Sequence, residues 1–223
     1  MSSELQAGLL LIVLPVAFNV TFFALGRAFD YPDILRRPTD EILRRFAAGG
    51  RRLIVLWYAF ALTGVLFLPL ALIVGELTAN DPLGRASVAF GLIAGIVQVV
   101  GLLRWPFLVP YLAGAYVAPG ASQASRDATI VTFESAHRFL GMAIGEHLGY
   151  FFTAVWTVLV ALALEGGGLV PDVLALAGLV PAAMILAGLL EPAGWRPAGA
   201  INAIGYLVWS AWLVALGIAL FLP

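Results

Sequence analysis

The stretch that decides the fold runs from Ala128 to Leu164, ATIVTFESAHRFLGMAIGEHLGYFFTAVWTVLVALAL. As one helix it would be about 55 Å long, whereas the hydrocarbon core of a bilayer is about 30 Å thick. We therefore expect part of the stretch to lie outside the apolar layer, or to bend. It also holds both histidines of the chain, which makes it the first place to search for a functional site.

The composition is that of an integral membrane protein. Of the 223 residues, 62% are hydrophobic and 11% are charged, and the mean hydropathy is +1.00. So few polar residues do not cover a soluble globule. The net charge of -1, with no basic run interleaved with aromatic residues outside the first connection, implies no nucleic-acid partner. The lack of cysteine excludes disulfides, thiolate metal sites and cysteine nucleophiles.

Apolar windows of about 20 residues, each long enough to cross a bilayer, predict six spanning helices. The windows are residues 8–26, 53–75, 86–103, 142–164, 170–190 and 199–221. The third continues past Arg104 to about residue 117, through Pro106 and Pro110, which predict a kink or a short re-entrant piece. No repeat of about 20 to 50 residues is evident. The predicted fold class is all-α, a polytopic membrane protein with a single helical membrane domain over residues 1–223.

The arginines indicate the orientation of the spans. Seven of them lie between Arg27 and Arg52, and the connections after the third and fifth spans carry three more. By the positive-inside rule, both termini are expected on the outer side of the membrane. Residues 8–26 are interpreted as a retained first span, with a cleaved signal peptide as the alternative. Trp57 and Tyr58 suit the aromatic belt at the inner interface.

The connection between the first two spans predicts an interfacial pair of short amphipathic helices. Pro32 suits a first helical position, Thr39 suits the cap of a second helix, and Gly50 suits its end. The candidate interface residues are Arg36, Arg37, Arg44 and Arg45, and the last two are placed, like Arg51 and Arg52, to reach lipid phosphates. A docking surface for a partner and a basic loop that only sets topology are the alternatives.

Glu134 and His137 are three residues apart and therefore share one helical face, which continues through Gly141 and Gly145. Carboxylate di-metal bundles use this Glu-x-x-His spacing, but they need two copies, and this chain has one. Glu134 and His137 are candidate metal ligands on this basis. In the alternative, Glu134 pairs with Arg138 and His137 is solvated. Gly141 and Gly145 are candidate interface positions where another helix packs closely.

Glu146 and His147 are expected about two turns inside the apolar layer, if the span begins near Phe139. An ionisable group at that depth costs at least about 2.5–3.5 kcal/mol unless it is paired, and is therefore a candidate functional group. Arg104 is the natural partner of Glu146. The pair is either structural, or functional with Arg104 holding an anionic group and Glu146 or His147 transferring protons. The candidate ligand-binding residues are Arg104, Glu146, His147 and Tyr150.

No cofactor is identified by the sequence. Haem ligated by both histidines of one chain is excluded, because His137 and His147 would lie about 15 Å apart along one helix. A haem or chlorophyll-type group on His147 alone stays open. No catalytic triad order, phosphate loop or His-Glu-x-x-His motif is present.

The leading interpretation is a ligand-binding or accessory, partner-binding subunit that uses the region of Arg104. Its expected partners are membrane lipids and either further copies of itself or a larger membrane complex. An intramembrane enzyme or redox protein that uses Glu146 or His147, with or without a metal or porphyrin, is the first alternative. A small oligomeric transporter is the second.

Four stretches of the sequence together point to a known family. In chain order they are FDYPDILRRPTDEIL, GLLRWPFLVPYLA, HRFLGMAIGEHLG and FFTAVWT. They resemble the bacterial membrane proteins of the domain of unknown function 4386 family, and the likeness covers most of the chain. The resemblance implies a polytopic helical protein of a bacterial inner membrane, and it assigns no activity or catalytic residue. Arg104, Trp105, His137, Glu146 and His147 all lie within these stretches.

Overall fold

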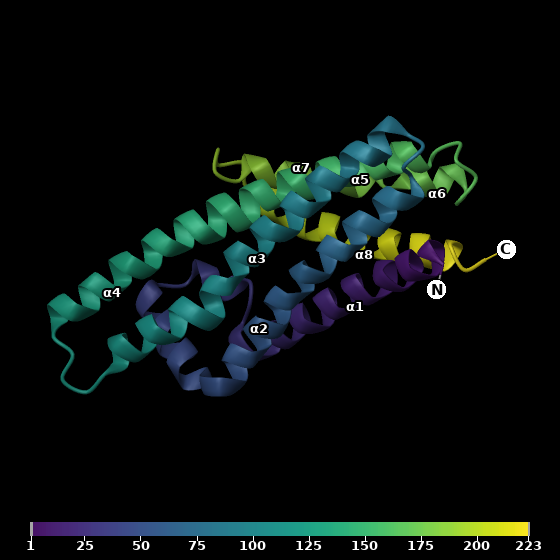
Figure 1. Ribbon diagram of the computed structural model, residues 1–223. Coiled ribbons are helices and arrows are strands. Elements are labelled where there is room, and N and C mark those ends of the chain that lie inside the picture. The colour runs from purple at the N-terminus through teal and green to yellow at the C-terminus, as the bar shows by residue number, and fades with distance from the viewer. Residues whose placement is uncertain (1, 223) are drawn as a thin grey trace. The chain divides into compact units, whose positions relative to one another are not determined.

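The computed structural model describes residues 2–222, which are all helical apart from turns and connections. Along the chain (Figure 1) the elements are α1 Ser3–Phe29, η1 Asp33–Arg36, α2 Thr39–Leu77, α3 Pro82–Val117, α4 Gln123–Ala136, η2 His137–Leu148, α5 Gly149–Leu164, α6 Asp172–Ala177, α7 Leu179–Ala187, η3 Gly188–Leu190 and α8 Ala198–Ala219. They form six segments that are long and apolar enough to cross a membrane. This confirms the predicted all-α, multi-pass architecture.

Two helices extend well beyond the hydropathy windows. α2 joins the short helix expected from Thr39 to the second span, although Gly50, with φ 53° and ψ -148°, interrupts the helical path. α3 continues through Pro106 and Pro110 as one helix rather than as a re-entrant piece. A proline removes only one backbone hydrogen bond, and neighbouring helices compensate for that loss in membrane proteins.

The expected pair of amphipathic helices takes a different form. The first member is a single four-residue turn, η1, and the second is the start of α2. The apolar stripe of that second helix, which includes Ile42, Leu43 and Phe46, is buried inside the protein, with exposed fractions of 3% or less. The stripe therefore packs against other helices of this chain, because its partners are the aromatic residues of α1 and α3.

The described chain forms two compact units. The first contains Met1–Val16, Gly64–Val97 and His147–Pro223, and the second contains Ala17–Thr63 and Gln98–Glu146. The chain passes between the units inside α1, α2 and α3 and near the end of η2, so neither unit is one continuous segment. The single domain expected from the sequence remains a prediction.

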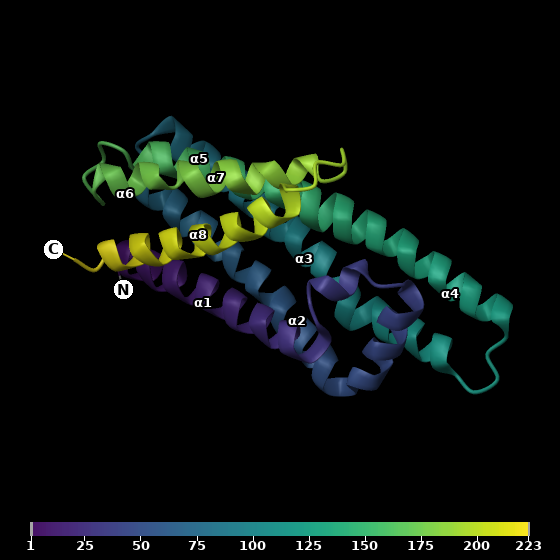
Figure 2. The same cartoon turned by 180° about the vertical axis from the view of Figure 1, so that it is seen from behind.

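In the first unit, the two ends of the chain lie side by side. Both views show the start of α1 beside the end of α8 (Figures 1 and 2). A Cβ atom built on Gly217 would lie 2.8 Å from the carbonyl oxygen of Gly8, so only glycine allows this approach. Small residues at such crossings are typical of helix packing in membranes.

The polar side chains of α8 find partners inside the first unit. Nε1 of Trp209 donates to Oγ1 of Thr157 at 2.8 Å, and Nδ2 of Asn202 donates to the carbonyl oxygen of Ile185 at 2.9 Å. Unpaired polar groups cost several kcal/mol in hydrocarbon, so these bonds fix how α8 packs on α5 and α7.

The second unit is built around two stacked tryptophans. The ring centroids of Trp57 and Trp105 are 4.3 Å apart with an interplanar angle of 8°, and both residues are at most 1% exposed. Phe29 packs edge-on against Trp105, and Phe46 packs face-on against the same ring. The expected place of Trp57 in the aromatic belt is therefore wrong, because its ring faces α3, whereas Tyr58 is 44% exposed.

Candidate functional site

Arg104 is the buried charge of the second unit. It lies on α3 and is 8% exposed. Its Nη1 donates to the carbonyl oxygen of Gly101, and its Nη2 lies 3.2 Å from Nδ1 of His137. Its Cζ lies 5.3 Å from the ring centroid of Trp105, within range of a cation–π interaction. Contacts on α3 and at the start of η2 therefore hold the guanidinium in place.

The contact with Arg104 defines the protonation of His137. A guanidinium has only donors, so Nδ1 of His137 is the acceptor and carries no proton. The neutral ring then has its proton on Nε2. The ring stacks on Phe133 at 5.7 Å and lies edge-on to Trp105 at 6.4 Å. In this arrangement neither ring nitrogen offers a free lone pair to a metal.

Glu134, the other candidate metal ligand, has a different partner. Its Oε1 accepts a hydrogen bond of 3.0 Å from Oγ1 of Thr39, which joins α4 to the start of α2. Among residues 2–222 no ion pair joins Glu134 to Arg138, and no group of three or more metal-binding side chains gathers. Glu134 and His137 are thus engaged with Thr39 and Arg104 rather than converging on one point.

The helix changes its hydrogen-bond register beside Arg104. η2, from His137 to Leu148, is π-helical, so its hydrogen bonds run from residue i to i+5. A helical face calculated with 3.6 residues per turn does not continue through a π-helix. A Cβ atom on Gly141 would lie 2.5 Å from Nη2 of Arg104, and one on Gly145 would lie 3.0 Å from Cα of Gly101. Both predicted interface glycines therefore lie against α3 of the same chain.

Glu146 and Tyr31 complete the polar part of this cluster. Glu146 acts electrostatically on both Arg104 and Tyr31. Tyr31, in the connection between α1 and η1, packs edge-on against Trp57 at 5.0 Å. Burial raises the pKa of the Tyr31 hydroxyl above its ordinary value, and Glu146 adds to the increase while Arg104 opposes it. The hydroxyl is therefore protonated at neutral pH and retains a hydrogen to donate.

Two buried donors of the cluster have no acceptor within the described chain. They are Nε of Arg104 and Nε1 of Trp57. Both groups donate only and accept nothing. A buried donor left unpaired costs about 1–3 kcal/mol. The cluster formed by Tyr31, Trp57, Arg104, His137 and Glu146, here named the Arg104 cluster, is short of acceptors.

The remaining predicted ligand-binding residues belong to the first unit. His147 is exposed, and Tyr150 packs against Tyr206 with the ring centroids 5.8 Å apart. The structure places Arg104 and Glu146 within electrostatic reach of each other in the second unit. The grouping of these two with His147 and Tyr150 in one site stays a prediction.

The sequence did not identify Tyr31 and Trp57 as members of the Arg104 cluster, nor Phe133 as the residue that stacks on His137. Tyr31 lies in a connection, where no helical period relates it to α3. Trp57 and Phe133 sit in segments whose apolar patterns do not specify which neighbour they meet. The one usable signal was the density of aromatic residues in the stretches FDYPD and RWPF.

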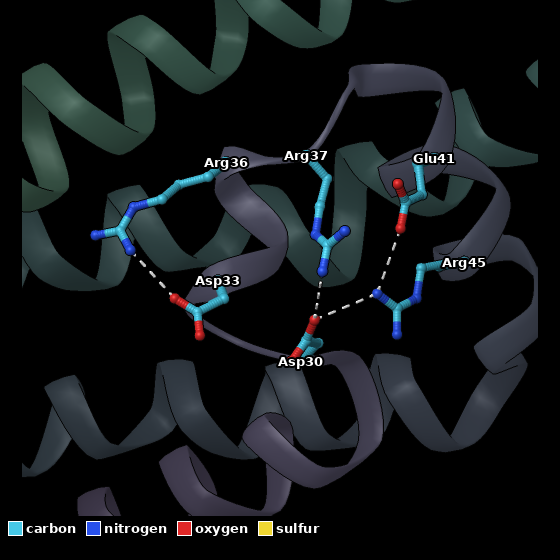
Figure 3. A network of polar contacts seen from close by, with 6 residues as sticks. All are labelled: Asp30, Asp33, Arg36, Arg37, Glu41 and Arg45. Atoms are coloured by element: carbon cyan, nitrogen blue, oxygen red, sulfur yellow. Dashed lines mark hydrogen bonds and ion pairs between the residues drawn. The ribbon is translucent and has the colours of Figure 1, made fainter.

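The four candidate interface arginines of the first connection are paired with carboxylates of the same connection, and Figure 3 draws Arg36, Arg37 and Arg45 with their partners. The pairs are Arg36–Asp33 at 3.2 Å, Arg37–Asp30 at 3.9 Å, Arg44–Asp40 at 3.9 Å, Arg45–Asp30 at 3.5 Å and Arg45–Glu41 at 3.6 Å. Such exposed pairs add at most about 1 kcal/mol each to stability. They do, however, offset the positive charge that these arginines would offer to lipid phosphates.

The unpaired Nε1 of Trp57 leads to a stability prediction. Trp57→Phe and Trp209→Phe remove the same volume and the same N–H, but only the N–H of Trp209 has an acceptor, Thr157. We expect Trp209→Phe to be the more destabilising by about 1 kcal/mol. Thermal unfolding in detergent, followed by loss of the monodisperse peak in size-exclusion chromatography, measures the difference. Equal losses would show that Nε1 of Trp57 does have an acceptor.

No curated protein and no solved structure matches the chain. One family model, described as Domain of unknown function (DUF4386), matches residues 6–217. The match begins within α1 and ends within α8, and so includes all six membrane-spanning segments and every residue of the Arg104 cluster. Because the match covers nearly the whole chain, the protein belongs to the family described as Domain of unknown function (DUF4386), as the four stretches of sequence had predicted.

Proposed function

We propose that this protein is a membrane-embedded binding protein whose Arg104 cluster holds a lipid-like ligand by an oxygen-rich group. Carboxylate, phosphate and quinone-type carbonyl groups share the required chemistry, because each presents acceptor oxygens and no competing donor. The single observation that carries the proposal is the excess of buried donors, Nε of Arg104 and Nε1 of Trp57.

The charge of Arg104 supports the same chemistry. Its two hydrogen-bonded partners, the carbonyl of Gly101 and the neutral ring of His137, carry no negative charge. Glu146 acts on it electrostatically but also acts on Tyr31. A cation in a spanning helix is costly, and an acceptor group on a ligand would reduce that cost.

The aromatic walls favour an amphiphilic ligand over a small ion. The rings of Trp57, Trp105 and Phe133 pack against Tyr31, Arg104 and His137, respectively. Binding sites for small molecules are mostly apolar, with a few polar groups that fix orientation. The accessory role predicted from the sequence rests on the same two donors, Nε of Arg104 and Nε1 of Trp57. In that role a partner subunit or a further copy of this chain takes the place of the ligand.

For the membrane setting, we propose a bacterial inner membrane with both termini on its outer side. The seven arginines from Arg27 to Arg52 support this orientation through the positive-inside rule. The exposed ion pairs of η1 and the first turns of α2 support a position of that connection at the inner interface, with its polar face toward the headgroups. A tag at the N-terminus that is reachable from outside intact cells would support the orientation, and a protected tag would contradict it.

The test of the proposed function is a comparison of co-purified compounds. Wild-type protein and the Arg104→Gln, Trp57→Phe and Arg138→Gln variants are purified in mild detergent, extracted with organic solvent and analysed by mass spectrometry. We expect one compound with acceptor oxygens in a fixed ratio to wild-type protein. Its amount should fall by about tenfold or more in Arg104→Gln, because hydrogen bonds to a charged group are lost.

The control variant in this comparison is Arg138→Gln. Arg138 follows His137 but is exposed, so its loss should leave the compound unchanged. The same compounds in the same amounts from all variants would contradict the proposal. An absorption spectrum and metal analysis of the same samples test the alternative, since a Soret band or a stoichiometric metal would support a redox protein.

A further inference from the structure

A groove lies where the end of α1 meets the bend of α2 in the second unit. Its volume is about 430 Å³. α1 contributes Ala24, Arg27 and Ala28, and α2 contributes Gly49, Arg52 and Leu56. The bend at Gly50, whose φ of 53° favours glycine, separates Gly49 from Arg52 and lets both line the same groove.

The two arginines of this groove differ from four of the other five arginines of the connection, because within the described chain only Arg51 among those five also lacks an ion pair. Arg36, Arg37, Arg44 and Arg45 all pair with carboxylates, as Figure 3 shows for three of them. Among residues 2–222 no ion pair includes Arg27 or Arg52. Two like charges that line one groove repel each other unless an anion lies between them.

The rest of the groove is apolar. Ala24, Ala28 and Leu56 offer methyl groups beside the two charges. Arg27 lies in the last turn of α1, where the apolar run of the first span ends. In a bilayer this is the level at which headgroup phosphates meet acyl chains. The groove thus combines a positive end with an apolar wall at the depth where a phospholipid has the complementary parts.

We propose that this groove binds an anionic phospholipid, whose phosphate lies between Arg27 and Arg52 and whose acyl chain lies against Ala24, Ala28 and Leu56. A membrane lipid is the occupant, rather than a soluble phosphate compound, because the apolar wall has no counterpart in a soluble anion. The site is separate from the Arg104 cluster and uses none of its residues. The lipid phosphate is thus contacted by Arg27 and Arg52 and not by the paired arginines of the connection.

The experiment is native mass spectrometry of the full chain in mild detergent, titrated with phosphatidylglycerol, phosphatidylcholine or inorganic phosphate. We expect Arg27→Gln/Arg52→Gln to weaken the binding of phosphatidylglycerol by about tenfold or more, because two charge-assisted contacts are lost. Ala28→Phe keeps both arginines but fills the groove, and it should weaken binding as well. If the double variant does not fold, Ala28→Phe still tests the proposal.

The matched control is Arg36→Gln/Arg51→Gln, which removes the same charge from the same connection but touches no groove residue. It should bind phosphatidylglycerol like wild type. An equal loss of phosphatidylglycerol binding in the control would overturn the proposal, because it would show that any loss of positive charge from the connection weakens binding. Displacement of the lipid by inorganic phosphate at equal concentration, or equally tight binding of phosphatidylcholine, would also overturn it.

Discussion

Gly101→Ala is expected to lower the stability of the protein by about 2–3 kcal/mol, because the added methyl group has no space. Its Cβ would lie 2.5 Å from Cα of Gly145, 3.1 Å from the backbone nitrogen of Gly145 and 3.0 Å from the carbonyl oxygen of Leu140. All three are backbone atoms, so no side chain can rotate away. Helices α3 and η2 would have to separate, and the contact of Arg104 with His137 would loosen with them.

The matched control for this prediction is Gly114→Ala in the same helix. A Cβ atom on Gly114 meets nothing within 4 Å, so the change should be neutral or stabilising by up to about 1 kcal/mol. For a chain of this size, the loss at Gly101 corresponds to a fall in melting temperature of about 4–12 °C. Similar melting temperatures for the two variants would show that α3 and η2 are not in close contact.

The second large effect is expected from Arg104→Met, at about 3 kcal/mol or more. The change removes the donor to Gly101 and His137 and the positive charge that acts on Glu146. Glu146→Gln alone leaves Arg104 without its acidic neighbour and should also destabilise. If the two charges are partners, the double variant costs less than the sum of the single ones, by about 1–3 kcal/mol.

Thermal or denaturant unfolding of the four proteins in one detergent measures this coupling. Arg138→Gln is the control, because Arg138 is exposed and should be replaced with little loss. Strictly additive losses would show that Arg104 and Glu146 are not partners and would leave His137 as the main contact of the guanidinium. The measurement requires protein free of co-purified ligand, since a ligand on Arg104 would stabilise only variants that bind it.

The candidate site was predicted only in part, and the reason is geometric. Arg104, His137 and Glu146 were identifiable because charges in apolar segments are rare and costly. Their arrangement could not be predicted. The assignment of residues to one helical face assumed an α-helix, whereas the chain forms a π-helix from His137 to Leu148. The contacts of His137 with Arg104 and of Glu134 with Thr39 join segments far apart in the chain, so the spacing of these residues did not predict them.

The sequence by itself determined the class of fold. Apolar windows depend only on local composition, so they predicted six helices long enough to span a membrane before any contact was known. They did not determine which helix faces which. In a membrane the lipid is as apolar as the side chains, so hydropathy does not distinguish a lipid-facing residue from a buried one.

Only the tertiary structure decided that Trp57 stacks on Trp105 and that Tyr31 joins them from a connection. It also decided which arginines are neutralised and which, Arg27 and Arg52, line a groove without a carboxylate. Those outcomes depend on close packing at glycines such as Gly101 and on the bend at Gly50. The packing at Gly101 is set by contact with a segment far along the chain, which a local pattern of residues does not predict, whereas the bend at Gly50 lies at a glycine that the sequence had placed at the end of a helix.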